Sequence, residues 1–175
     1  MMRAWRSTVV RWLWLLVLFS TTASAGWQEA LPNARLLGSG EFTWFGFKVY
    51  SARLWSPEKS LRADTPFALE LTYRRTISRE DLVQTSLEEI QRLSGAGVSP
   101  AQLKDWQAQM QRAFVDVEPG QRITGVFLPG RGVQFFVDQR LQHVVDDEAF
   151  ARAFFAIWLD SRTRNPQLRA QLLGR

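Results

Sequence analysis

Residues 36–55 have the sequence LLGSGEFTWFGFKVYSARLW, in which apolar and polar side chains alternate on both sides of Phe45-Gly46. A period of two is typical of a β-strand that buries one face, and a central glycine supplies a turn. We therefore predict a hairpin whose tip pairs Trp44 with Phe47. In that register one face of the hairpin is shared by four polar residues, Glu41, Thr43, Lys48 and Tyr50.

The rest of the chain supplies more strands and a set of helices. Alternating or β-rich runs predict four strands, over residues 67–73, 122–128, 133–137 and 141–145. Amphipathic stripes that follow capping residues predict four helices, which begin after Ser78, Ser99, Asp146 and Asn165. Hairpins with segregated helices are typical of an α+β domain, so we expect a long antiparallel sheet with a layer of helices on one face.

The first 25 residues differ in composition from the remainder. Arg3, Arg6 and Arg11 come before an apolar run over residues 12–19, and small residues end the segment at Ala25. This order is typical of a secretory signal peptide, and the run is shorter than the roughly 20 residues that span a bilayer. We predict a signal peptide over residues 1–25, cleavage after Ala25, and one exported domain over residues 26–175. That domain would be periplasmic in a Gram-negative host, with no stable membrane anchor after processing.

Composition excludes several classes of function. The 175 residues include no Cys and one His, which excludes disulfides, thiolate nucleophiles and most metal sites. We therefore expect no metal and no cofactor. The net charge of +5 suggests an anionic partner, but the signal segment carries three of the excess Arg residues. What remains has no basic run and no nucleic-acid module, so we expect no nucleic-acid partner.

Few residues of the domain have the patterns that catalysis requires. The single histidine, His143, lies in an apolar strand, where an ordinary packing or surface role is expected. The polar face of the hairpin is either its solvent side, with Glu41 paired to Lys48, or the polar lining of a cleft. Tyr50 and Tyr73 are the only tyrosines. A buried tyrosine hydroxyl needs a partner, which in a pocket can be a ligand oxygen.

Several segments, taken in order, resemble the bacterial exported branch of the chalcone isomerase-like proteins. They are GSG at 38–40, KVYSARLW at 48–55, YR at 73–74, ISREDL at 77–82, FARAFFAIWL at 150–159 and LLG at 172–174. The resemblance covers almost all of the chain after residue 25. It implies an open-faced β-sandwich, in which a ligand cleft lies between a long antiparallel sheet and the helices.

The resemblance also implies that the isomerase residues have changed. Plant isomerases use an Arg and a Thr from the first two strands. Here Thr43 is the residue nearest to the Arg position, and Tyr50 aligns with the Thr. The Tyr and Asn that follow on a helix are replaced by Glu80 and Leu87. Because the guanidinium that would stabilise developing charge is missing, we expect no isomerase activity.

Non-catalytic members of the family bind fatty acids through an Arg and a Tyr on this hairpin. By this resemblance Tyr50 preserves the Tyr, and Lys48 or Arg74 would supply the positive charge. We therefore predict an exported protein that binds a small amphipathic or fatty-acid-like molecule without turning it over. The predicted ligand-binding residues are Thr43, Lys48, Tyr50, Tyr73 and Arg74.

Two alternatives stay open from the sequence. The first is an intramolecular lyase, an isomerase that acts on an unidentified substrate. The second is an interaction module whose cleft is filled by its own side chains. Trp and Phe rings packed between the sheet and the helices would support the second alternative.

Overall fold

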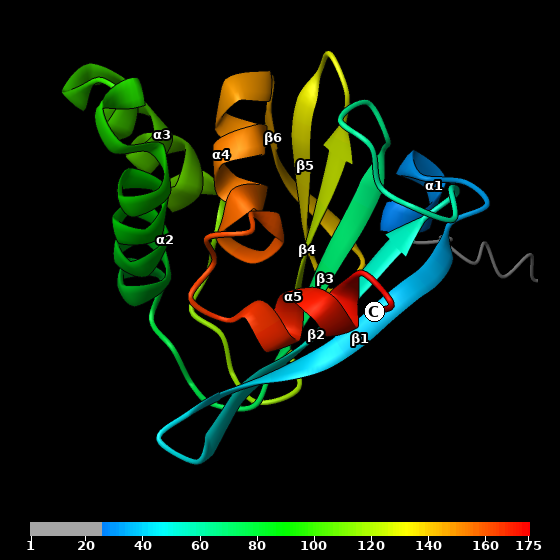
Figure 1. Ribbon diagram of the computed structural model, residues 1–175. Helices are drawn as coiled ribbons and strands as arrows, with labels where there is room; N and C mark the ends of the chain where they lie inside the picture. Colours follow the sequence, from blue (N-terminus) through cyan, green and yellow to red (C-terminus); the bar gives the residue numbers. More distant parts are fainter. Residues whose placement is uncertain (1–25) are drawn as a thin grey trace, which may run out of the picture.

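Six alternating segments pair in the order in which they occur, so the sheet is a single antiparallel meander (Figure 1). The computed structural model describes residues 26–175, and the predicted signal peptide lies outside the described residues. The strands are β1 (Arg35–Trp44), β2 (Phe47–Ser56), β3 (Phe67–Tyr73), β4 (Arg122–Leu128), β5 (Gly132–Val137) and β6 (Arg140–Val145). All six strands lie where the sequence predicts strands.

The longer helices cover one face of this sheet, as predicted (Figure 1). They are α2 (Arg79–Ser94), α3 (Pro100–Ala113), α4 (Glu148–Leu159) and α5 (Pro166–Leu172), with the 3₁₀ turn η1 (Gly95–Gly97) after α2. Helix α4 packs on β5 and α5 packs on β1, while α2 lies against α4. Among residues 26–175, no helix is long and apolar enough to cross a membrane.

Polar side chains begin these helices, mostly at the predicted residues. Ser78 and Ser99 accept hydrogen bonds from backbone N–H groups of α2 and α3, and Asn165 does the same for α5. The predicted cap of α4 is displaced by one residue. Asp147, not Asp146, accepts from the Phe150 N–H over 2.9 Å, and its other carboxylate oxygen accepts from the Trp106 indole N–H at 2.9 Å.

A short N-terminal helix, α1 (Trp27–Ala30), was not expected from the sequence. With four residues, the helix is too short to show the repeat of apolar residues by which helices are predicted. Trp27 is buried on the side of the sheet away from the other helices, where it packs in a second apolar cluster with Ala68, Val126 and Phe136. The four longer helices all lie on the opposite face (Figure 1), so the predicted α+β architecture with its helical layer on one face is confirmed.

Candidate functional site

The tip of the β1–β2 hairpin has the predicted register. Trp44 pairs with Phe47, and Thr43 pairs with Lys48. Lys48 also reaches Glu41, with 2.7 Å between Nζ and Oε2, and both side chains are exposed. The polar side chains at the tip therefore form its solvent side, which is one of the two alternatives that the sequence left open.

A β-bulge reverses the faces of the hairpin directly after the tip. Val49 is an extra residue in β2, so Tyr50 pairs with Phe42 and not with Glu41. A shift of one residue moves every later side chain to the opposite face of the strand. The prediction that one face is shared by Tyr50 with Glu41, Thr43 and Lys48 is therefore wrong.

The bulge turns Tyr50 toward the helices, where aromatic rings enclose it. Trp158 Nε1 donates a hydrogen bond to the Tyr50 hydroxyl oxygen over 3.0 Å. Phe42 stacks on Tyr50 with the ring centroids 5.0 Å apart, and Tyr73 meets it edge-on at 6.1 Å. Burial raises the pKa of Tyr50 to about 12, against the opposing effect of the Trp158 hydrogen bond, and burial also raises the pKa of Tyr73. Both side chains are neutral phenols at physiological pH.

Tyr50→Phe is expected to lower the free energy of unfolding by about 1 kcal/mol at neutral pH, because the Trp158 N–H loses its acceptor. The raised pKa of Tyr50 adds a pH signature. Its stabilising contribution is complete below pH 10, the ordinary pKa, and is lost as the pH rises toward 12. The alkaline loss of stability should therefore be smaller in the variant. Guanidinium denaturation, followed by tryptophan fluorescence from neutral to alkaline pH, measures both effects.

Tyr73→Phe is the matched control for this prediction. Within residues 26–175 the Tyr73 hydroxyl makes no hydrogen bond, although the ring is buried. The control variant should therefore lose less stability than Tyr50→Phe at neutral pH. Equal losses would contradict a specific role for the bond between Tyr50 and Trp158.

The five predicted ligand-binding residues do not converge on one space. Thr43 and Lys48 are exposed at the hairpin tip, and Arg74 is exposed just after β3. Tyr50 and Tyr73 are brought together by the pairing of β2 with β3, where Tyr73 is buried in the core and the half-buried Tyr50 packs against it. None of the five lines the cavity described below. Their role in ligand binding stays a prediction.

Aromatic rings fill the middle of the space between the sheet and the helices. Phe154 on α4 is the centre of this packing, with ring centroids between 5.2 and 5.9 Å from those of Phe114, Phe135, Phe150, Phe155 and Trp158. These contacts combine edge-on and stacked geometries, which aromatic pairs favour. The interior therefore matches the packing expected of a cleft filled by its own side chains.

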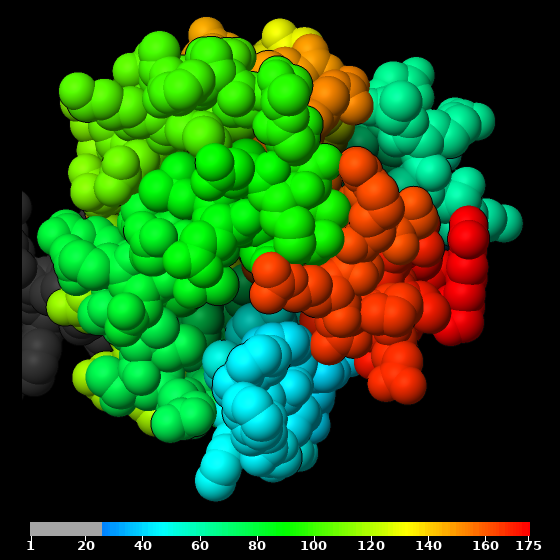
Figure 2. Space-filling view, turned by 60° about the vertical axis from the view of Figure 1, so that its left-hand side comes forward, coloured from blue at the N-terminus to red at the C-terminus, as the bar shows by residue number. Residues whose placement is uncertain are grey.

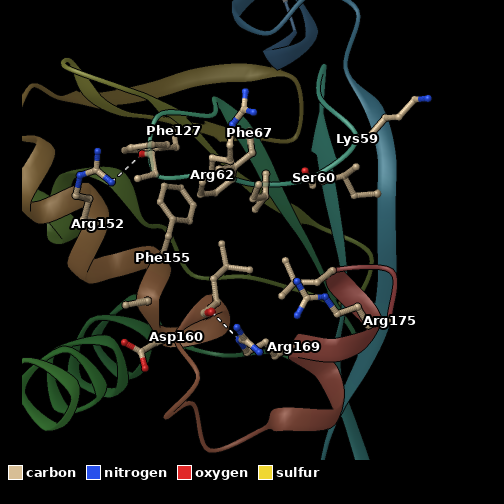
Figure 3. Close-up of a pocket in the computed structure, with 16 residues that line it drawn as sticks. Lys59, Ser60, Arg62, Phe67, Phe127, Arg152, Phe155, Asp160, Arg169 and Arg175 are labelled. Atoms are coloured by element: carbon tan, nitrogen blue, oxygen red, sulfur yellow. Dashed lines mark hydrogen bonds between the residues drawn. The ribbon is translucent and has the colours of Figure 1, made fainter.

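An open cavity of about 420 Å³ lies at one end of this filled interior (Figure 3). Strands β1, β3 and β4 form its floor, and the β2–β3 loop, α4 and α5 form its walls. The apolar part of its lining comes mainly from six side chains, Leu37, Phe67, Phe127, Phe155, Leu159 and Leu173. The cavity therefore lies between the sheet and the helices, where the family resemblance placed the ligand cleft.

Basic side chains predominate among the charged groups around this apolar floor. The lining includes Lys59, Arg62, Arg152, Arg169 and Arg175 against one acid, Asp160. Figure 3 shows Arg175 directed toward the cavity and Lys59 directed away from it. A concave apolar surface with convergent cations suits a ligand that carries a negative charge on an apolar body.

Two of these arginines are held in place by the fold. Arg152 donates to the Ala63 carbonyl and, through Nε, to Glu148, each over 2.9 Å, and its guanidinium lies 5.3 Å from the centre of the Phe127 ring. Arg169 Nε donates to the Leu159 carbonyl over 2.7 Å. These bonds attach α4 to the β2–β3 loop and α5 to the end of α4 (Figure 3). Both charges are therefore preorganised at the cavity wall.

The single acid of the lining is already neutralised. Asp160 accepts hydrogen bonds from the backbone N–H of Arg162 at 2.8 Å and from its guanidinium at 2.8 and 3.0 Å. These bonds lower the pKa of Asp160 to about 2. The carboxylate is therefore ionised but paired at physiological pH. By contrast, no ion pair holds the side chains of Arg62 and Arg175 within residues 26–175.

The residues that line this cavity were not among those predicted from the sequence. Its apolar residues follow the same strand and helix periods as the rest of the core, so no pattern separates them. Its cations come from a loop, two helices and the residue after Gly174, and no spacing rule joins such segments. The one available signal was the pair Lys59 and Arg62 in the loop between two strongly predicted strands.

Comparison with known proteins agrees with this geometry. The sequence profile of the chalcone isomerase-like proteins matches residues 30–174, almost the whole described chain. The chain belongs to the chalcone isomerase-like family. The family resemblance found in the sequence is thus confirmed, and the position of the cavity in this chalcone isomerase-like domain matches the cleft that the resemblance implied.

Two further similarities support the family and the fold. This chalcone isomerase-like chain is 29% identical over 162 residues to an uncharacterized protein of Haemophilus influenzae (strain ATCC 51907 / DSM 11121 / KW20 / Rd), over 92% of this chain and 75% of the relative. Its structure resembles the crystal structure of a fatty-acid binding protein of Arabidopsis thaliana, with a TM-score of 0.65 and 14% identity. That match covers 82% of this chain and 88% of the plant protein, and it shows a shared fold.

Proposed function

We propose that this protein is an exported carrier that binds a small amphipathic carboxylate, such as a fatty acid, without turning it over. The observation that supports the proposal is the cavity of about 420 Å³, whose apolar floor is bordered by Arg62, Arg152, Arg169 and Arg175. The plant protein of similar fold is a fatty-acid binding protein. Export rests on the signal-peptide pattern of residues 1–25.

The two parts of the cavity match the two parts of such a ligand. A guanidinium can form two parallel hydrogen bonds with a carboxylate, which makes arginine the preferred partner of this group. Each buried methylene of an alkyl chain contributes about 0.8 kcal/mol when it leaves water. The side chains of Phe67, Phe127 and Phe155 offer apolar surface beside the charges. Carboxylate and chain are therefore both accommodated.

Binding without chemistry follows from the groups in the lining. The one carboxylate there, Asp160, has a pKa of about 2 and is paired with Arg162, so it is a poor general acid or base near neutral pH. The remaining charged groups of the lining are Arg and Lys. The isomerase positions named in the sequence analysis also hold other residues. Together these features favour a binding protein over an intramolecular lyase.

Arg175→Glu is expected to weaken the binding of saturated fatty acids by about tenfold, because a cation directed into the cavity becomes an anion. Among residues 26–175 the Arg175 side chain makes no ion pair, so the fold should not change. Isothermal titration calorimetry with octanoate to octadecanoate measures the affinities. The methyl esters of the same acids should bind both proteins equally, since they carry no charge.

Arg131→Glu is the matched control. It makes the same charge change at an exposed residue in the turn between β4 and β5, outside the cavity. Affinity should stay unchanged in this variant. If none of the acids binds or shifts the melting temperature, and native mass spectrometry of protein purified from cells shows no bound ligand, then the proposed function is wrong.

A second candidate, an interaction module, is favoured by the ring packing around Phe154. In that case the filled part of the cleft is purely structural, and the open cavity stays empty. The same titrations separate the two functions, because an interaction module would bind none of the acids.

A further inference from the structure

The tip of the β1–β2 hairpin exposes three large aromatic side chains. Trp44 is 56% exposed, Phe45 is 84% exposed and Phe47 is 65% exposed. We call these three residues the aromatic tip. Figure 2 shows the hairpin, in cyan, projecting from the body of the protein next to α5. The aromatic tip is therefore a convex apolar finger, whereas scattered exposed apolar residues occur singly on most surfaces.

The backbone at the aromatic tip is strained in a way that presents Phe45 to solvent. Phe45 has a φ of 47° and Gly46 a φ of 80°, the left-handed region that both central residues of this tight turn require. Asn, Asp and Gly are the usual residues there, because a bulky side chain is disfavoured in this conformation. Phe45 gains little in return from packing, since it touches mainly Trp44, at 5.0 Å between ring centroids. The fold does not explain a phenylalanine at this position.

Three cations flank the aromatic tip. Lys48 lies on the hairpin, and Arg74 and Arg75 follow β3, which pairs with β2. The guanidinium of Arg75 lies 5.7 Å from the centre of the Phe47 ring, so this charge is fixed beside the rings. One of these cations, Lys48, forms an ion pair with the acid Glu41. The surroundings of the aromatic tip therefore carry an excess of positive charge.

We propose that the aromatic tip inserts into the surface of an anionic lipid bilayer. Trp and Phe rings partition into the boundary between headgroups and acyl chains, and Lys or Arg near the surface each add about 1 kcal/mol of attraction to anionic lipids. A protein partner would need a concave apolar site to receive the finger, whereas a bilayer accepts a convex one. The charge and the shape together favour lipid. This interaction surface is separate from the cavity and does not depend on the proposed ligand.

A fluorescent label at the turn tests the proposal directly. The chain has no Cys, so Phe45→Cys creates a single labelling site for an environment-sensitive nitrobenzoxadiazole dye. We expect emission to rise about threefold and shift to the blue with vesicles of equal parts phosphatidylcholine and phosphatidylglycerol, as the dye leaves water. Vesicles of phosphatidylcholine alone should give a weaker response. Adding Arg75→Gln should weaken partitioning to the anionic vesicles about fivefold.

Arg131→Cys, labelled in the same way, is the control, because it lies at the exposed β4–β5 turn and away from the aromatic tip. Its emission should not change with either vesicle. The proposal is overturned if the Phe45→Cys label does not respond, or if both labels respond equally. It is also overturned by blue-shifted emission without vesicles. Such emission would indicate a second copy of the chain if it grows with protein concentration, and another segment of the same chain if it does not.

A second measurement tests whether Phe45 is needed for the stability of the fold. Phe45→Asn should unfold at an equal or higher guanidinium concentration than the wild type, because Asn tolerates the left-handed conformation. A clear loss of stability would show that Phe45 serves the fold, which would also overturn the proposal.

Discussion

Gly38→Ala should destabilise the protein by about 3 kcal/mol and abolish binding in the cavity. A Cβ atom at Gly38 would lie 2.0 Å from the Gln171 carbonyl oxygen and 2.6 Å from that of Leu172. Both oxygens belong to the backbone of α5, so α5 must move away from β1. That movement displaces Leu173 and Arg175 from the cavity. Guanidinium denaturation gives the free energy of unfolding, and calorimetry with dodecanoate gives the affinity.

Gly97→Ala is the matched control, because a Cβ atom there meets nothing within 4 Å and the backbone is not in the left-handed region. Its stability should stay within about 0.5 kcal/mol of the wild type. Gly40→Ala should lie between the two. Its Cβ would meet the end of the flexible Gln171 side chain at 2.2 Å and Leu168 Cδ1 at 2.7 Å. If Gly38→Ala resembled the control, close contact between β1 and α5 would not be what positions that helix.

Phe135→Ala should cost about 3–5 kcal/mol of unfolding free energy, the range expected when a fully buried phenylalanine is truncated. The Phe135 ring is fully buried and meets Phe114 and Phe154 edge-on, at 5.5 and 5.2 Å between centroids. Removing it leaves a hole that the rings of Phe114 and Phe154 cannot close without moving. Chemical denaturation followed by tryptophan fluorescence measures the loss.

Phe47→Ala makes the same chemical change at a residue that is largely exposed. It should cost less than about 1 kcal/mol, because little surface leaves contact with protein. Similar losses at the two residues would mean that the aromatic interior contributes far less to stability than its packing indicates. The structural reading of the filled cleft would then be wrong.

Periodicity was sufficient to predict the sheet and the helical layer from the sequence. Residues 67–73 alternate in polarity and residues 122–128 are rich in β-forming side chains, and the capping hydroxyls of Ser78 and Ser99 mark where helices begin. Each of these signals lies within a few residues of the structure that it predicts. These signals can therefore be recognised in the sequence without a structure.

The site could not be predicted in the same way, because its determinants are not local. The bulge at Val49 follows from how β2 meets both β1 and β3, and it carries no distinctive residue. Because of that one extra residue, Tyr50 faces the helices while Lys48 faces solvent. The cavity is lined by α5 and by the loop that follows β2. These segments are far apart in the sequence, so no local pattern predicts that they meet. The Asp147 carboxylate that caps α4 is likewise bonded to Trp106, a residue of another helix.

The strictly sequential sheet has a consequence for how the protein folds. The hairpins β1–β2, β4–β5 and β5–β6 can form locally, with small losses of loop entropy, whereas the pairing of β3 with β4 must span α2 and α3. The contact of α5 with β1 spans still more of the chain, since it joins the last described element to the first strand. This contact closes the longest loop and also completes the cavity wall. We therefore expect a ligand that enters the cavity to stabilise this long-range contact between α5 and β1.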